Sequence, residues 1–190
     1  PDWQYLSKFT DMKPYETQKD FLRHYLPVKK AYHLKGMLLD AKPGSGKTPM
    51  SLMWSVLNRN GKHIIVCPNS IVRSVWEEHI KRKFFKNPPV MWTSQDGTPP
   101  NPKAEYYVFH NEFLRGPQWF NSLKMIFGWA GNSGVDMIVD ESHNFNELTA
   151  SQTQNLIAAT DHFPFADCLP MSGTPLKALG REAYTVFACI

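Results

Sequence analysis

The chain has few cysteines and no long apolar run, and both absences narrow the possible classes of protein. Its three cysteines, Cys67, Cys168 and Cys189, are far apart and odd in number. This spacing argues against a disulfide framework and a zinc site, and it favours a reducing compartment. No apolar run is long enough to span a bilayer, and no cleavable signal pattern is present at the N-terminus. We therefore expect an intracellular location, cytoplasmic or nuclear.

Charge of either sign is also modest. Lys and Arg number 21 against 17 Asp and Glu, which gives a formal net charge of +4. This charge permits an anionic partner without requiring one. With 42% hydrophobic and 20% charged residues, 190 residues are enough for one globular domain. Because the sequence starts at Pro1 and ends within the apolar stretch 184–190, we expect residues 1–190 to be one domain of a longer protein.

Apolar, strand-like runs alternate with helical patterns along the chain. Strands are expected at 37–40, 64–67, 90–93, 106–109, 135–139 and 168–171, and helices at 21–25, 49–60, 72–84, 119–129 and 151–159. Buried strands separated by helices predict an α/β fold, with a mostly parallel sheet covered by helices on both faces. Ligands of such sheets bind at the carboxyl ends of the strands.

A glycine-rich octet follows the first of these strands and precedes a helix. Such a loop brings backbone N–H groups close to phosphate oxygens, while its lysine adds a positive charge and its threonine a hydroxyl for Mg²⁺. The alternative is an ordinary glycine turn with an exposed lysine. The order of strand, turn, lysine and helix favours a nucleoside triphosphate site. The residues expected to bind it are Lys42, Pro43, Gly44, Ser45, Gly46, Lys47 and Thr48.

Two adjacent carboxylates, Asp140 and Glu141, follow the apolar strand at 135–139. Carboxylates at the end of a hydrophobic strand are costly unless something uses them. Beside a phosphate loop, the first can hold Mg²⁺ together with Thr48, and the second can deprotonate an attacking water. Taken alone, the pair would more often be a helix N-cap. We therefore predict catalytic roles for Lys47, Asp140 and Glu141.

A third polar segment, Ser172-Gly173-Thr174-Pro175, follows the last apolar strand. Alone it is an ordinary turn, because Gly and Pro both interrupt regular structure. Its position after the third of the strands that end in polar motifs favours a relay role. His143 is the one histidine singled out, because it lies beside the carboxylate pair.

Two weaker signals lie outside these three segments. Gln18 has the donor and acceptor that suit the edge of adenine, although an exposed glutamine at a helix start is the more common reading. Pro68, Asn69 and Ser70 form a strand-to-helix turn suited to nucleic-acid phosphates. The basic residues that follow, 81–83 and Lys86, can extend such a track or simply form a solvated helix end.

The ordered segments resemble the first motor domain of superfamily-2 helicases, over about residues 13–180. The octet matches the form with alanine at its first position, Asp140-Glu141-Ser142-His143 looks like the DESH variant of the second motif, and Ser172-Gly173-Thr174-Pro175 is similar to the third motif. The run 64–68, followed by Val75-Trp76-Glu77-Glu78, looks like motif Ia of Swi/Snf-type translocases. Pro14-Tyr15 with Gln18 resembles the adenine-reading entry motif of that group.

The resemblance implies a RecA-like P-loop NTPase domain that couples ATP hydrolysis to movement on nucleic acid. Double-stranded DNA is the expected partner, with Mg²⁺ as cofactor. It implies coupling roles for His143, Ser172, Gly173 and Thr174, and phosphate-backbone contacts for Pro68, Asn69, Ser70 and Asn111.

The chain departs from the family pattern in two ways. Residues 42–45 read Lys-Pro-Gly-Ser, which marks a divergent member. A second RecA-like domain, which supplies an arginine worth about a thousandfold or more in rate, is absent from the sequence. Two alternatives remain open. One is a self-contained P-loop ATPase or phosphotransferase with Arg115 or Arg181 as its arginine, and the other is a nucleotide-gated binding module with little turnover.

Overall fold

A computed structural model describes residues 1–145, 147–173 and 188 of the chain. Thr174, Pro175 and Arg181, which the sequence singled out, lie outside this described part. Within it, no helix combines the length and apolarity needed to cross a membrane.

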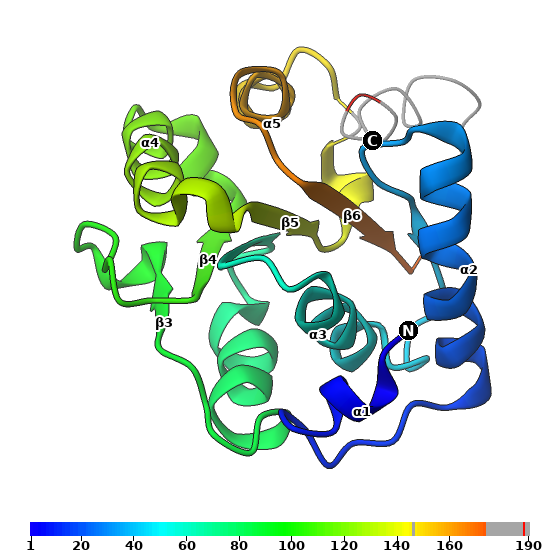
Figure 1. The fold of residues 1–190 in the computed structure, drawn as a ribbon. Coiled ribbons are helices and arrows are strands. Elements are labelled where there is room, and N and C mark those ends of the chain that lie inside the picture. Colours follow the sequence, from blue (N-terminus) through cyan, green and yellow to red (C-terminus); the bar gives the residue numbers. More distant parts are fainter. Residues whose placement is uncertain (146, 174–187, 189–190) are drawn as a thin grey trace.

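A six-stranded sheet forms the centre of the molecule (Figure 1). Its spatial order is β1-β6-β5-β2-β4-β3, and every pairing is parallel. The expected α/β fold is therefore confirmed. The strands are β1 (Leu39–Asp40), β2 (Lys62–Cys67), β3 (Met91–Thr93), β4 (Tyr106–His110), β5 (Val135–Val139) and β6 (Asp167–Ser172).

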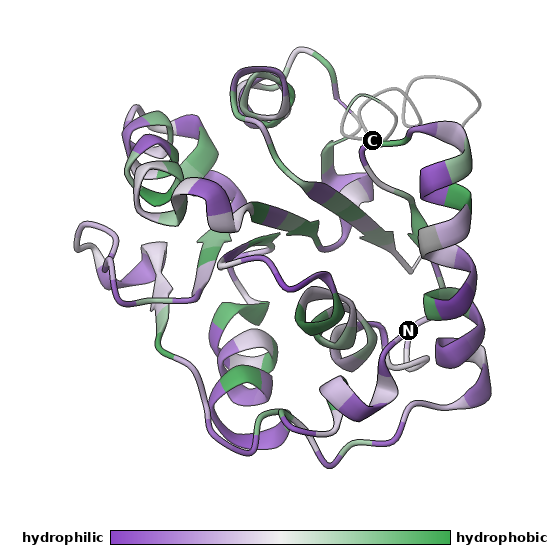
Figure 2. Cartoon of the chain, viewed as in Figure 1, coloured by the Kyte–Doolittle hydropathy of each residue, from purple (hydrophilic) through white to green (hydrophobic). Residues whose placement is uncertain are grey.

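Helices cover both faces of this sheet, and the hydropathy colouring places the most apolar segments in its central strands (Figures 1 and 2). One face carries α1 (Trp3–Leu6), α2 (Glu16–Tyr32), α3 (Lys47–Asn58) and two π-helical segments, η1 (Val72–Glu77) and η2 (His79–Lys83). The other carries α4 (Gln118–Ala130) and α5 (Ser151–His162). Short 3₁₀ turns lie at Ser94–Asp96, Asn111–Arg115, Gly131–Ser133 and Ser142–Phe145.

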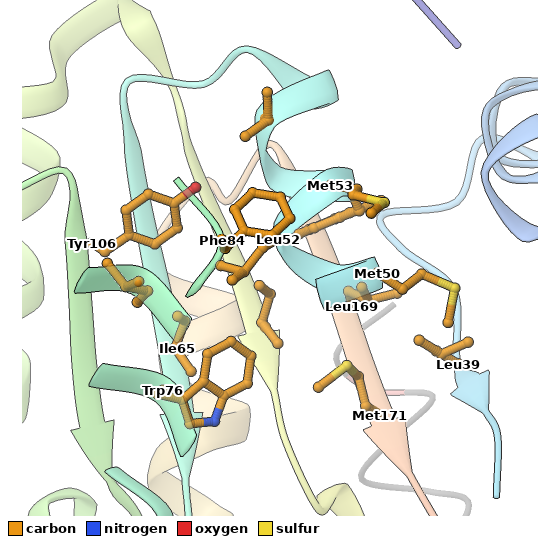
Figure 3. Packing of buried hydrophobic residues seen from close by; sticks show 14 of the residues in the cluster. Leu39, Met50, Leu52, Met53, Ile65, Trp76, Phe84, Tyr106, Leu169 and Met171 are labelled. Atoms are coloured by element: carbon orange, nitrogen blue, oxygen red, sulfur yellow. The ribbon is translucent and has the colours of Figure 1, made fainter. Parts of the chain in front are cut away.

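The side-chain alternation of β2 divides the core into two clusters. Ile65 and Cys67 face the cluster under α3, whereas Ile64 and Val66 face the cluster under α4 and α5. This is the period of two that a strand imposes. In the first cluster, Leu52 and Met53 of α3 pack beside Leu169 and Met171 of β6 (Figure 3). Burying both faces explains why the central strands read as continuous apolar runs.

Helix α2 is far longer than the 21–25 segment that the sequence indicated. Near its carboxyl end, Lys29 Nζ lies 2.8 Å from Asp167 Oδ2 at the start of β6, and the Tyr25 hydroxyl donates to the same carboxylate. Burial raises the pKa of Asp167, while the hydrogen bonds from Lys29 and Tyr25 oppose that shift. These long-range contacts hold α2 along β6, so local periodicity underestimates its length.

Helix α3 ends earlier than residue 60, its predicted end. The helix stops at Asn58, and Arg59 takes the left-handed conformation with a φ of 57°. Gly61 lets the chain approach the turn before β5. Its N–H donates to Ser133 O at 2.9 Å, and a Cβ built on Gly61 would lie 2.0 Å from Ser133 Oγ. The glycine is therefore needed for this close approach.

We expect Gly61→Ala to lower the free energy of unfolding by about 1–3 kcal/mol, because the added methyl group overpacks against Ser133. The matched control is Gly128→Ala in α4, where an added Cβ meets open space. This control should gain up to about 1 kcal/mol from helix propensity. Urea unfolding of both variants measures the difference, and equal stabilities would contradict the close-approach role of Gly61.

Candidate nucleotide site

The glycine loop at 41–46 connects the end of β1 to the start of α3. Ala41 N donates to Ser172 O at 3.1 Å, which continues the β1–β6 pairing into the loop. Gly44 and Gly46 have φ angles of +79° and +78°. L-residues rarely adopt this region, so glycine is required at both positions for the loop to turn back on itself.

Helix α3 begins at Lys47 with its amino end uncapped. Its N-cap residue is Gly46, and no side chain accepts a hydrogen bond from the first turn. The first turn also has no acidic residue. Unpaired N–H groups and the positive end of the helix dipole make such a terminus an anion site. The loop can therefore accept phosphate without displacing a side-chain cap.

Lys47 is folded onto its own loop in this structure. Its Nζ donates to Ala41 O at 2.9 Å and to Lys42 O at 3.5 Å. A Cβ built on Gly173 would lie 3.1 Å from Lys47 Nζ, so the ammonium group also sits against the end of β6. The lysine thus lies between the loop and the residues that follow β6.

Gln18 lies on α2, beside the glycine loop. Its Oε1 accepts from Tyr15 N at 2.9 Å, and its Nε2 donates to Gly46 O at 3.2 Å. The side chain is buried, at 2% relative exposure, and a Cβ on Gly46 would lie 2.6 Å from Nε2. Gln18 therefore joins the start of α2 to the loop. Recognition of adenine by this residue stays a prediction.

Asp140 ends β5, and hydrogen bonds hold its backbone and both carboxylate oxygens. Its N–H donates to Val66 O of β2 at 2.8 Å. Oδ1 accepts from Glu141 N at 2.9 Å, and Oδ2 accepts from Trp76 Nε1 at 3.1 Å. Burial, followed by the charge of Glu141, raises the pKa of Asp140 to about 6, whereas the two hydrogen bonds and Lys47 oppose the rise. The Lys47 effect shows that the structure brings the loop lysine close to Asp140.

Glu141 has a left-handed backbone, with a φ of 50°. A residue with a Cβ pays conformational strain there, which occurs most often at functional sites. Its Oε2 lies 3.2 Å from His143 Nδ1, and the same Nδ1 lies 3.2 Å from Ser172 Oγ. His143 therefore connects the carboxylate pair to the end of β6.

The donor set fits a magnesium ion that is shared with a nucleotide. Mg²⁺ in phosphate-transfer sites takes one or two protein oxygens and completes its shell with phosphates and water. Asp140 and the Thr48 hydroxyl at the start of α3 are the oxygen ligands that the sequence predicts. In the described part of the chain, no three His, Cys, Asp or Glu residues gather as a metal site. The described residues thus do not form a metal site in which these four residue types supply three or more ligands.

The residues predicted to contact nucleic acid lie at the ends of β2 and β4. Asn69 and Ser70 are exposed, and Gln95 Nε2 holds Asn69 through its carbonyl at 2.9 Å and its Oδ1 at 2.6 Å. Asn111 is 6% exposed, and its buried Oδ1 has no hydrogen-bond partner in the part of the chain that the structure describes. Its side chain thus presents little surface to a ligand, and a phosphate contact from Asn111 stays a prediction.

Sequence reasoning missed one contact of this site, the bond between Trp76 and Asp140. Trp76 lies within the helix expected at 72–84, and the structure buries it completely. Its indole N–H nevertheless reaches the carboxylate across the sheet edge. Apolar periodicity describes which face of a helix is buried, and it carries no signal for this hydrogen bond.

Comparisons with known proteins agree with this geometry. Residues 11–177 match the family model described as type III restriction enzyme, res subunit. No curated protein sequence matches the chain.

The solved structures that share the fold include two that cover 90% or more of this chain. One is the Sulfolobus solfataricus SWI2/SNF2 ATPase core in complex with dsDNA, with a TM-score of 0.71 at 12% identity over 95% of this chain and 36% of that one. The other is the Pyrococcus furiosus Hef helicase domain, with a TM-score of 0.57 at 15% identity over 90% of this chain and 38% of that one. The chain thus spans little more than a third of either matched chain.

The raised pKa of Asp140 predicts a stability difference that depends on pH. In the folded protein the pKa of Asp140 is about 6, above the value of 3.8 for an ordinary aspartate. The native state therefore binds the proton more tightly than the unfolded chain, and it loses stability as the pH rises from about 3.8 to about 6. An asparagine does not titrate. Relative to wild type, Asp140→Asn should therefore gain about 3 kcal/mol between pH 3.5 and pH 7.

Urea unfolding in EDTA across this pH range measures the effect. Asn offers one acceptor oxygen where Asp offers two, so the free energies of unfolding of the two proteins also differ by a lost hydrogen bond at every pH. The titration is reported by the change of this difference with pH. The exposed Asp161→Asn serves as the control and should follow wild type. A pH-independent difference for Asp140→Asn would contradict the raised pKa.

Proposed function

The chain belongs to the family described as type III restriction enzyme, res subunit, and on that premise we propose that it is the ATP-binding motor domain of a nucleic-acid translocase or helicase. One observation carries this proposal. The glycine loop, the Asp140–Glu141 pair and Ser172–Gly173 follow β1, β5 and β6, and these are adjacent strands in the order β1-β6-β5. Segments far apart in the sequence thus meet at one edge of the sheet, where α/β proteins bind ligands.

In this proposal the loop and the amino end of α3 bind the triphosphate of ATP. Lys47 exchanges its contacts with the carbonyls of Ala41 and Lys42 for phosphate oxygens. Thr48 and Asp140 hold Mg²⁺, which offsets the negative charge on the phosphates when it is bound. Because phosphates and water would supply the remaining oxygens, this pair of protein ligands is sufficient.

Glu141 is proposed as the base that orients and deprotonates the attacking water. Its left-handed backbone directs the side chain away from the buried position of Asp140, and the Glu141 side chain is 34% exposed. His143 contacts both Glu141 and Ser172. A movement at the end of β6 can therefore reach the base through one imidazole, which supports the proposed coupling role of His143, Ser172 and Gly173.

The proposed track is duplex DNA, and the exposed turn after β2 is its proposed contact. Asn69 and Ser70 present polar groups and backbone amides at the same sheet edge as the nucleotide site. Such groups bind phosphates without reading sequence. The structural neighbour from Sulfolobus solfataricus was solved with dsDNA, which supports a duplex as the partner.

A second RecA-like domain is proposed to complete the site in the full-length protein. The chain covers 36% and 38% of the two structural neighbours, so a motor of their length has room for it. An arginine from that domain would stabilise the transition-state charge. Arg115, the one predicted lid arginine that the structure describes, bonds Gln152 of α5 at 3.1 Å. We therefore assign the catalytic arginine to the second domain.

We expect Lys47→Ala to weaken ATP binding at least about tenfold, because it removes a charge-assisted contact to phosphate. Isothermal calorimetry with MgATP measures the change. Lys124→Ala, an exposed lysine of α4 on the opposite face of the sheet, is the matched control and should bind like wild type. Unchanged affinity in the Lys47 variant would remove the loop from the ATP site.

Glu141→Gln in the full-length protein should bind ATP within about twofold of wild type and hydrolyse it at least about a hundredfold more slowly. The amide keeps the size and loses the basicity. The exposed Glu147→Gln controls for the loss of one negative charge nearby. Phosphate release in the presence of duplex DNA measures the rate, and wild-type turnover in Glu141→Gln would exclude Glu141 as the base.

A further inference from the structure

We infer that Trp76 is a positioning residue for the magnesium site, and that its indole N–H fixes the orientation of the Asp140 carboxylate. This inference rests on the proposed function, since it assigns a supporting residue to the same site. Trp76 belongs to η1, on the face of the sheet that α3 covers, and its indole N–H bonds Asp140 rather than the phosphate-binding loop.

The indole of Trp76 differs from the other buried indoles in bonding a carboxylate. Trp92 is 4% exposed, and its N–H has no hydrogen-bond partner among the described residues. Trp54 is 1% exposed and packs edge-on against the ring of Tyr25. Trp76 is 0% exposed, and its N–H donates to Asp140 Oδ2 at 3.1 Å. Because the core tolerates an unpaired indole N–H at Trp92, packing alone does not require the direction of the Trp76 indole.

Among the described residues, Trp76 is the one that donates a hydrogen bond to Oδ2. Oδ1 is held by Glu141 N, the next residue of the same chain. A single hydrogen bond to Oδ1 lets the carboxylate rotate about χ2, whereas bonds to both oxygens fix its plane. Each oxygen keeps a second lone pair for a ligand. The Trp76 bond therefore orients the remaining lone pairs and leaves them available.

This arrangement has the physical character of an outer-shell contact at a metal site. Such contacts orient the ligand atoms, and their removal lowers metal affinity about 10- to 100-fold. The indole N–H is well suited to the task because it only donates, so it bonds the carboxylate and cannot itself bind the metal. A residue that acted only by packing would change stability and leave metal affinity unchanged.

The test compares Trp76→Phe with the matched control Trp54→Phe in the same core cluster. Both changes remove a buried indole, and only the first removes a hydrogen bond to Asp140. With ATP bound, Mg²⁺ titration should show about a 10- to 100-fold loss of Mg²⁺ affinity in Trp76→Phe and less than about a twofold loss in Trp54→Phe. Nucleotide affinity in EDTA should be the same for both. Equal Mg²⁺ affinities would overturn the inference.

A second variant covers the case in which Trp76→Phe does not fold. Benzothienylalanine at position 76 keeps the shape of the indole and replaces its N–H with sulfur, so it should show the same loss of Mg²⁺ affinity. Wild-type affinity in this protein would overturn the inference. If the wild-type chain binds no ATP, the proposed function fails at that step, before the variants are compared.

An indole ¹H–¹⁵N spectrum of the metal-free chain gives an independent readout. The Trp76 signal is identified by its absence in the position-76 variant. Asp140→Ala should shift this signal and leave those of Trp54 and Trp92 near their wild-type positions, because the indole that bonds Asp140 is that of Trp76. A Trp76 signal that does not move in Asp140→Ala would show that the contact does not exist in solution, which would overturn the inference whatever the outcome for ATP.

Discussion

The buried carboxylate of Asp140 is the constraint on which the rest of the site depends. An ionised group at the end of a strand enclosed on both faces loses most of its hydration, which costs free energy unless other groups replace it. Here two N–H donors and the nearby Lys47 replace part of that hydration, yet the pKa still rises to about 6. The site is therefore under-neutralised at neutral pH, and a cation at Asp140 would relieve that deficit. In the proposed site, the buried charge of Asp140 lowers the stability of the folded protein, and ligand binding offsets that loss.

The parallel sheet explains how such a site is assembled from distant segments. Every strand ends at the same edge, so side chains that follow β1, β5 and β6 meet without any local contact along the chain. The opposite edge is stabilised separately. There His63 Nδ1 lies 2.7 Å from Asp136 Oδ1, and Lys29 pairs with Asp167. Polar and charged side chains at the amino ends of the strands thus hold the strands together. The polar side chains at the carboxyl ends remain available for a ligand.

Much of this arrangement was predictable from the sequence, and the reasons are physical. The run 135–139 coincides with β5, because four of its five residues are apolar and both faces of the strand are buried. The one polar residue, Asp136, is paired with His63. The glycine loop was identified because positive φ angles demand glycine at Gly44 and Gly46. The strand order and the bonds of Gln18 and Trp76 were not predictable. They depend on tertiary contacts between residues far apart in the chain, for which a single sequence provides no local signal.

Lys47 donates to two carbonyl groups of its own loop. These contacts affect which anions the loop binds. An incoming anion must compete with the dipoles of Ala41 and Lys42 for the ammonium group. A small, singly charged anion gains little from that exchange, because it replaces two good acceptors with one. A polyphosphate brings several charges and also reaches the helix terminus, so its gain is cooperative. The contacts of Lys47 with its own loop thus lower the affinity for small anions more than the affinity for polyphosphates. The loop therefore favours long phosphate chains over the smaller anions that are abundant in any cell.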